Sequence, residues 1–85
     1  VLALVFLLGL VGGAHAEDKK AAEKYFKLGA KAYAAQNFEA AATSFDEAFK
    51  NYAMPEIAFS AAQAYRRLYQ VEPRPEYVKR AVELY

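Results

Sequence analysis

Few side chains in this sequence carry a nucleophile, a base or a metal ligand. The chain has one histidine, His15, and no cysteine, so it offers neither a thiolate nor a His/Cys metal set. The hydroxyls of Thr43, Ser44 and Ser60 fall at helical positions with no adjacent base. Asp46-Glu47 are neighbouring carboxylates without a predicted pocket, and we interpret them as surface residues. The sequence therefore predicts a non-catalytic chain with no cofactor and no metal site.

The overall charge gives little indication of a polyanionic partner. Eleven basic and ten acidic residues leave a net charge of +1, which favours neither nucleic acid nor an anionic membrane surface. Arg66-Arg67 lie between Tyr65 and Tyr69, but two arginines in a near-neutral chain are a weak nucleic-acid signal. We predict no nucleic-acid partner.

The first sixteen residues contain no Lys, Arg, Asp or Glu. An apolar run, Val1–Val11, is followed by small residues and by Ala14-His15-Ala16, the pattern of a secretory signal peptide with an A-x-A cleavage site. The run is shorter than the ~18–20 apolar residues that a membrane anchor needs, and a buried helix suits a segment apolar on all faces poorly. We predict a signal peptide at residues 1–16, cleavage after Ala16, export, and no membrane span in the mature chain. His15 then has no role.

Residues 17–53 have the periodicity of a helical hairpin. Asp18 is the predicted cap of a first helix, and Gln36-Asn37 form the hinge, with Asn37 capping a second helix. Gly29 lies inside the first helix, where it costs about 1 kcal/mol relative to Ala, so we expect a second helix to pack closely on it. The apolar positions of the first helix are Ala21, Tyr25, Leu28, Ala32 and Ala35, opposite a solvated stripe of Lys20, Lys24, Lys27 and Lys31. Those of the second helix are Phe38, Ala41, Ala42, Phe45, Ala48, Phe49 and Tyr52.

A second, less regular hairpin is predicted from Pro55 onwards. Proline suits the first position of a helix, and Glu56 suits the first turn. Two prolines in Pro73-Arg74-Pro75 interrupt the pattern, which predicts an ordered but longer loop between Leu68 and Tyr77 and a last helix from about Pro75. That helix continues to Tyr85, and together with Val at position 1 this indicates a fragment of a longer protein.

The spacing of Tyr25, Leu28-Gly29, Tyr33, Phe38, Ala41, Phe45 and Ala48 resembles the tetratricopeptide repeat, a helix–turn–helix unit of ~34 residues. Ala32 stands where the pattern has tyrosine, and Pro55 arrives about two residues late. Phe59 follows Phe26 by 33 residues, and Ala62 then matches Gly29. The resemblance implies an all-α fold of antiparallel helix–turn–helix repeats within residues 17–85, repeat 1 at about 22–55 and a partial repeat 2 at about 55–85. The residues expected to pack the repeats are Leu28, Gly29, Ala41, Phe45, Ala48, Ala62, Tyr65 and Ala81.

In such arrays the first helix of each hairpin lines a concave groove that binds a peptide or a partner helix. By resemblance, this groove contains Phe26, Ala30, Tyr33, Phe59, Gln63, Arg66 and Arg67. The aromatic residues would grip apolar side chains and the arginines a carboxylate; packing between hairpins, or simple solvation, is the alternative role for each. The Lys/Asn clamp of some chaperone-binding members is not present, because Phe26 and Ala30 occupy positions that would need charged or amide side chains.

The resemblance, together with the leader, implies a protein-interaction scaffold of the bacterial periplasm or cell envelope, with a protein or peptide partner. Two alternatives remain open. The chain is the N-terminal scaffold of a larger exported protein, with further repeats or an enzymatic or anchoring domain beyond Tyr85, or it is a membrane-anchored helical protein that retains its leader.

Overall fold

The computed structural model describes residues 18–85, which form four α-helices and no strand. They are α2 (Lys19–Ala34), α3 (Phe38–Asn51), α4 (Pro55–Val71) and α5 (Pro75–Leu84). The predicted all-α class is confirmed for this part of the chain. The predicted signal peptide, its cleavage site and His15 lie outside the described residues.

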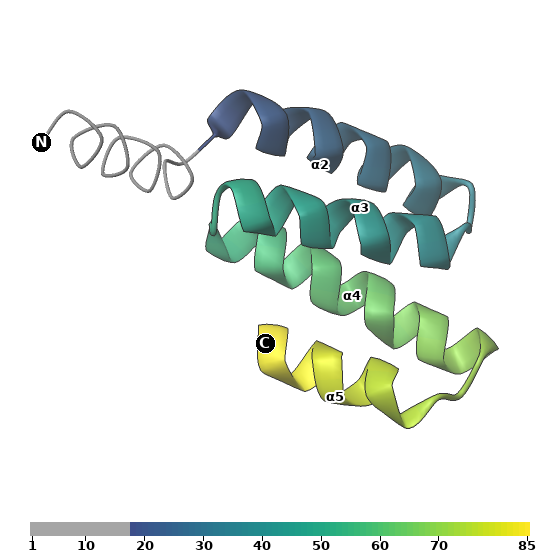
Figure 1. Ribbon diagram of the computed structural model, residues 1–85. Coiled ribbons are helices and arrows are strands. Elements are labelled where there is room, and N and C mark those ends of the chain that lie inside the picture. The colour runs from purple at the N-terminus through teal and green to yellow at the C-terminus, as the bar shows by residue number, and fades with distance from the viewer. Residues whose placement is uncertain (1–17) are drawn as a thin grey trace, which may run out of the picture.

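Successive helices run antiparallel and pack in chain order (Figure 1). α3 packs between α2 and α4, and α4 packs between α3 and α5. Each of the three connections is three residues long, at residues 35–37, 52–54 and 72–74. Connections this short leave antiparallel packing as the simple arrangement of neighbouring helices.

Each helix of the first hairpin begins at a side-chain cap, and both caps are at predicted positions. The Asp18 carboxylate accepts a hydrogen bond from the backbone N–H of Ala21 at 2.9 Å, and Asn37 Oδ1 accepts one from Ala40 at 3.3 Å. Each cap satisfies a backbone donor that has no partner within its own helix. Between the two caps, Gln36 adopts φ = 62°, a left-handed conformation that turns the chain at the end of α2.

The second hairpin uses proline in place of side-chain caps. Pro55 and Pro75 are the first residues of α4 and α5, as predicted, and Met54 and Arg74 before them are extended, with ψ of 144° and 132°. The longer loop expected after Leu68 is wrong, because α4 continues to Val71. Pro73 disfavours helical geometry only at the residue directly before it, so the helix can run on to within two residues of it.

The core of residues 18–85 is built mainly from alanine. Nine of its fourteen buried apolar residues are alanines, and the five larger ones are Phe38, Phe45, Ile57, Leu68 and Leu84. Small side chains let the helices approach closely, as at Gly29, where an added Cβ would lie 2.6 Å from the ring of Phe45. Close packing at Gly29 was expected, and Phe45 of α3 is the residue packed against it.

The expected role of Leu28 in helix packing is wrong. Leu28 is 47% exposed, while Ala22 and Gly29 are buried, and Tyr25, Phe26 and Tyr33 are partly buried. The face that α2 turns to α3 is therefore centred on Gly29, about 100° around the helix from Leu28. On α3 the predicted stripe is observed, with Phe38, Ala41, Ala42, Phe45 and Ala48 all buried.

Candidate functional site: an apolar groove between α2 and α4

A groove of about 320 Å³ lies between α2 and α4. Three residues of α4 and four of α2 line it, and a buried ring of α3, Phe45, closes it from the third side. The lining residues are Phe26, Ala30, Tyr33, Ala34, Phe45, Phe59, Ser60 and Gln63. Its surface is largely apolar, as peptide and small-molecule sites in proteins commonly are.

Helical spacing brings these residues together. Phe26, Ala30 and Tyr33 stand at three- and four-residue steps along α2, and Phe59 and Gln63 stand four apart on α4, so each set shares one face of its helix. Ala30 and Ala34 have small side chains, so they leave space beside the aromatic rings on the α2 side of the groove. Phe26 is fixed against Phe45, with ring centroids 5.3 Å apart.

Phe59 is the exposed aromatic residue of the groove. It is 54% exposed, and it meets the ring of Tyr85 edge-on, with ring centroids 5.9 Å apart. An exposed ring that is held on one side presents a preformed apolar contact with little conformational entropy to lose on binding.

Two guanidinium groups lie near the Gln63 end of the groove. The Arg66 side chain is exposed and donates to Gln63 Oε1 at 3.4 Å. The Arg67 guanidinium lies over the rings of Phe38 and Tyr33, 4.7 and 5.9 Å from their centroids. Within residues 18–85 neither arginine forms an ion pair. Both therefore retain the capacity to bind a carboxylate.

The structure thus brings together five of the seven predicted groove residues, Phe26, Ala30, Tyr33, Phe59 and Gln63. Arg66 and Arg67 are not lining residues. Arg66 donates a hydrogen bond to the lining residue Gln63, and the guanidinium of Arg67 lies over the ring of Tyr33. Packing, the alternative role considered for these residues, applies in part to Phe26 and Arg67, because each also packs against a neighbouring ring.

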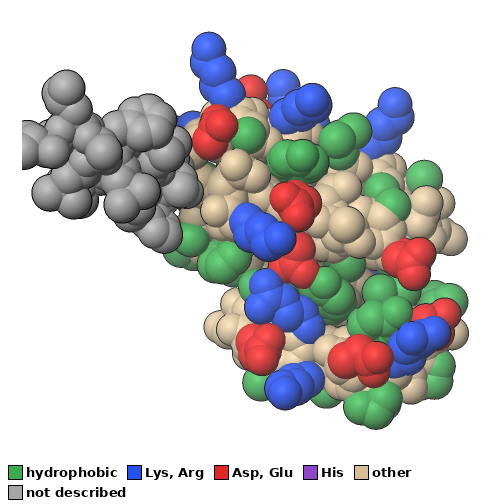
Figure 2. Space-filling view, in the orientation of Figure 1, with side chains coloured by type: hydrophobic (Ala, Val, Ile, Leu, Met, Phe, Trp, Pro, Cys, Tyr) green, Lys and Arg blue, Asp and Glu red, His purple; other side chains and the backbone are tan. Residues whose placement is uncertain are grey.

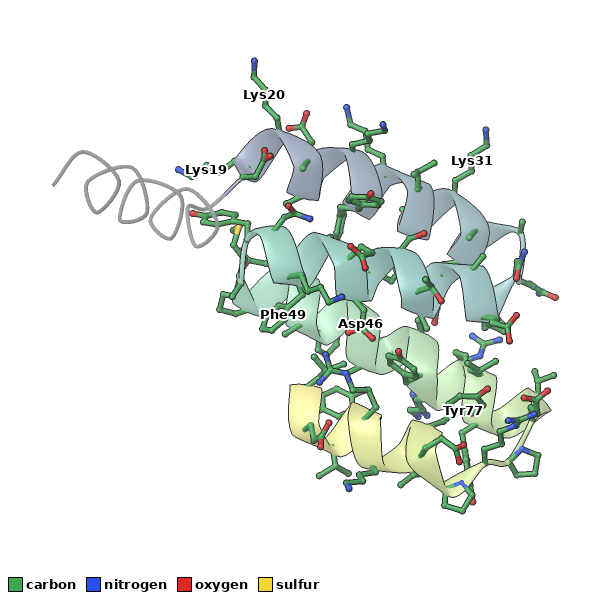
Figure 3. All side chains as sticks on the ribbon, in the orientation of Figure 1. Lys19, Lys20, Lys31, Asp46, Phe49 and Tyr77 are labelled. Carbon is green, nitrogen blue, oxygen red and sulfur yellow. The ribbon has the colours of Figure 1, made fainter. Side chains whose placement is uncertain are left out.

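A polar cluster that the sequence did not predict joins three helices. Asp46 of α3 accepts a hydrogen bond from the hydroxyl of Tyr65 of α4 and another, at 2.7 Å, from Arg80 Nη2 of α5. The Asp46 side chain is labelled in Figure 3. It is only 22% exposed, so the interpretation of Asp46 as a surface residue is wrong. Its partners lie 19 and 34 residues away, a distance that no local pattern reveals.

The cluster shifts the titration of two of its members. Burial, and then the hydrogen bond to the Asp46 carboxylate, raise the pKa of Tyr65 well above its ordinary value of 10.0. The hydrogen bond to Asp46 also raises the pKa of Arg80. Tyr65 therefore stays a neutral donor and Arg80 a cation at neutral pH, the states in which both stabilise the carboxylate.

A second hollow, of about 550 Å³, lies over α3, α4 and α5. It contains Thr43, Ser44, Tyr65 and Tyr77, and the Tyr77 hydroxyl donates to Glu72 at 3.1 Å. Across residues 18–85 no three His, Asp or Glu side chains come together as metal ligands. No helix in this range is long and apolar enough to cross a bilayer.

Comparison with known protein families, curated proteins and solved structures gives no match. Function is therefore inferred from the geometry of residues 18–85 and from the sequence itself.

Proposed function

We propose that this chain is a non-catalytic interaction scaffold of the tetratricopeptide type, which binds a peptide or a partner helix in the groove between α2 and α4. The observation that carries the proposal is the exposed Phe59 in an apolar groove bordered by Arg66, an arginine outside any ion pair of the described residues. The occupant would place apolar side chains between Phe26 and Phe59 and a carboxylate at the Arg66 end.

Two pairs of residues support the repeat interpretation. Gly29 and Ala62 are 33 residues apart and both are buried, and so are Ala48 and Ala81. The small residues of both hairpins thus occupy equivalent packed positions. The match is incomplete at Phe45, which is buried, while Val78 at the same offset is 41% exposed.

Selection from a displayed library of random peptides tests the groove. We expect selected sequences to share two or more apolar residues and an acidic residue. Peptides selected against the chain should fail to enrich when Phe59→Ser is the target, and should still enrich against Val71→Ser, which alters an exposed apolar residue at the end of α4. Equal enrichment on both variants would place the binding surface elsewhere.

We further propose that the chain is exported to the bacterial periplasm or envelope after removal of residues 1–16. N-terminal sequencing of the exported product is expected to begin at Glu17. A product that retains Val1–Val11 would support the membrane-anchored alternative instead.

An exposed apolar surface at α5 is compatible both with this scaffold and with the second candidate, the scaffold region of a larger exported protein. Val78 and Val82 stand four residues apart on α5 and are 41% and 69% exposed, and Tyr85, directly after the helix, is 62% exposed. A further packed element would cover this surface. The coding sequence beyond Tyr85 decides: helical repeats favour the simple scaffold, and a catalytic or anchoring pattern favours the larger protein.

A further inference from the structure

The outer face of α2 carries a continuous row of lysines. Lys20, Lys24, Lys27 and Lys31 recur at four- and three-residue steps, and all four are exposed. Figure 3 shows Lys20 and Lys31 pointing away from the other helices, and Figure 2 shows basic side chains along this edge of the molecule. With a rise of 1.5 Å per residue, the row extends over about 16 Å.

Charge is segregated on this face, although the chain as a whole is nearly neutral. α2 contains five lysines and a single acidic residue, Glu23, whereas the chain has a net charge of +1. Elsewhere in residues 18–85, Lys50, Arg74 and Arg80 are each engaged in an ion pair, whereas Arg66 and Arg67 are not. Among the ion pairs of residues 18–85, the one on α2 joins Lys27 to Glu23 at 3.6 Å with both side chains largely exposed, so it compensates little of the positive potential of the row.

An apolar side chain borders the row. Leu28 lies between Lys24 and Lys31 in helical steps and is 47% exposed, although sequence periodicity placed it in the core. A helix with a lysine-rich face and an exposed leucine beside it is suited to the headgroup region of a bilayer. Lysine stems there lie along the apolar boundary with their ammonium groups at the phosphates.

We propose that this face of α2, Lys20, Lys24, Lys27 and Lys31 with Leu28, rests on an anionic phospholipid surface. Lysine suits a surface of mobile phosphates as a point charge, and the face lacks the arginine and aromatic residues that grip nucleic-acid bases. Phe26 and Tyr33 of the peptide groove lie on another side of α2, so lipid contact leaves the groove open.

Vesicle flotation of the purified chain tests this assignment. Vesicles of phosphatidylcholine alone and of equal parts phosphatidylcholine and phosphatidylglycerol are compared, so that any binding by the apolar leader contributes to both. We expect tighter binding to the anionic vesicles, lost as salt rises from ~0.05 M to ~0.5 M. The variant Lys20→Gln/Lys24→Gln/Lys31→Gln should reduce the anionic preference by a factor of ten or more, since each lysine near such a surface contributes about fivefold.

A charge-matched control variant, Lys50→Gln/Arg74→Gln/Lys79→Gln, removes three positive charges away from α2 and should retain the preference. Leu28→Ser should weaken binding to anionic vesicles, whereas Val71→Ser, at an exposed valine of α4, should not. Equal losses in the two triple variants would overturn the proposal, because net charge and not this face would then be responsible. So would binding to poly-glutamate or duplex DNA without binding to anionic vesicles.

Discussion

At the scale of single residues, Gly29 sets how closely the first two helices approach. A Cβ at this position would lie 2.6–3.0 Å from three ring atoms of Phe45, a residue that is 4% exposed and packed against Phe26. We expect Gly29→Ala to lower the free energy of unfolding by about 1–3 kcal/mol, because overpacking outweighs the ~1 kcal/mol gained in helix propensity. Urea unfolding followed by circular dichroism measures the change.

The exposed neighbour Ala30 provides the matched control for Gly29. Ala30→Gly changes propensity alone and should cost no more than about 1 kcal/mol. A Gly29→Ala variant as stable as the native chain would show that α2 and α3 can move apart without cost, and would contradict their close packing at Gly29.

Asp46 is the second residue with a specific stabilising role. Asp46→Asn keeps the shape but removes the charge that holds Tyr65 and Arg80, and we expect a loss of about 1–2 kcal/mol in unfolding free energy. Glu47→Gln removes an adjacent charge whose partner Lys50 is exposed, and should cost less than about 0.5 kcal/mol. Equal effects of the two substitutions would contradict a specific role for Asp46.

The raised pKa of Tyr65 implies a loss of stability at alkaline pH. Because the pKa is higher in the folded chain than the unfolded value of 10.0, the contribution of Tyr65 is complete below pH 10.0 and is lost as pH rises towards the folded pKa. Tyr77, whose pKa is also raised by burial and by Glu72, acts in the same direction. Unfolding measured from about pH 8 to about pH 11 should show this decline, with a shallower slope in Tyr65→Phe. An unchanged slope would argue against the shift.

At the scale of elements, the turn at Gln36 determines how α2 leads into α3. Its φ of 62° is strained for a residue with a Cβ, and glycine adopts this conformation without cost. We expect Gln36→Gly to stabilise the chain by about 0.5–1 kcal/mol, measured by the urea midpoint. Ala35→Gly, at a neighbouring residue with φ of −82°, should destabilise it. A destabilised Gln36→Gly variant would contradict the observed hinge geometry.

Sequence predicted where the helices begin better than which face α2 buries. Caps at Asp18 and Asn37 and starts at Pro55 and Pro75 follow from local chemistry, because each involves neighbouring residues in the chain. The buried face of α2 depends instead on contact with Phe45 of another helix. Two apolar registers are available on α2, and the leucine at position 28 favoured the wrong one.

At the scale of the whole molecule, the core is small. Most buried residues of the described chain are alanines, and no large side chain within it is fully buried. Short helical arrays also bury a modest fraction of their surface. We expect residues 17–85 to unfold in a broad transition at low temperature when isolated, as measured by circular dichroism. A sharp, cooperative transition with a high midpoint in the monomer would contradict this expectation.

Long-range features mark the limit of what the sequence reveals about the candidate site. Phe26, Tyr33, Phe59 and Gln63 were predicted as a group because a repeat spacing relates them, and they do line one groove. Asp46 and Arg80 were not, because the repeat pattern concerns apolar packing positions and does not predict a contact between polar side chains of the non-consecutive helices α3 and α5. Their pairing depends on the way α3 and α5 both pack on α4.

The most direct test of the account is the affinity of a groove-selected peptide for the native chain and for two variants, measured by fluorescence polarisation. We expect Phe59→Ser to weaken binding at least tenfold, because the exposed ring is the central apolar contact of the groove. Val71→Ser, with equal helix content, should bind as the native chain does. Equal affinities for all three proteins would contradict the groove between α2 and α4 as the binding site.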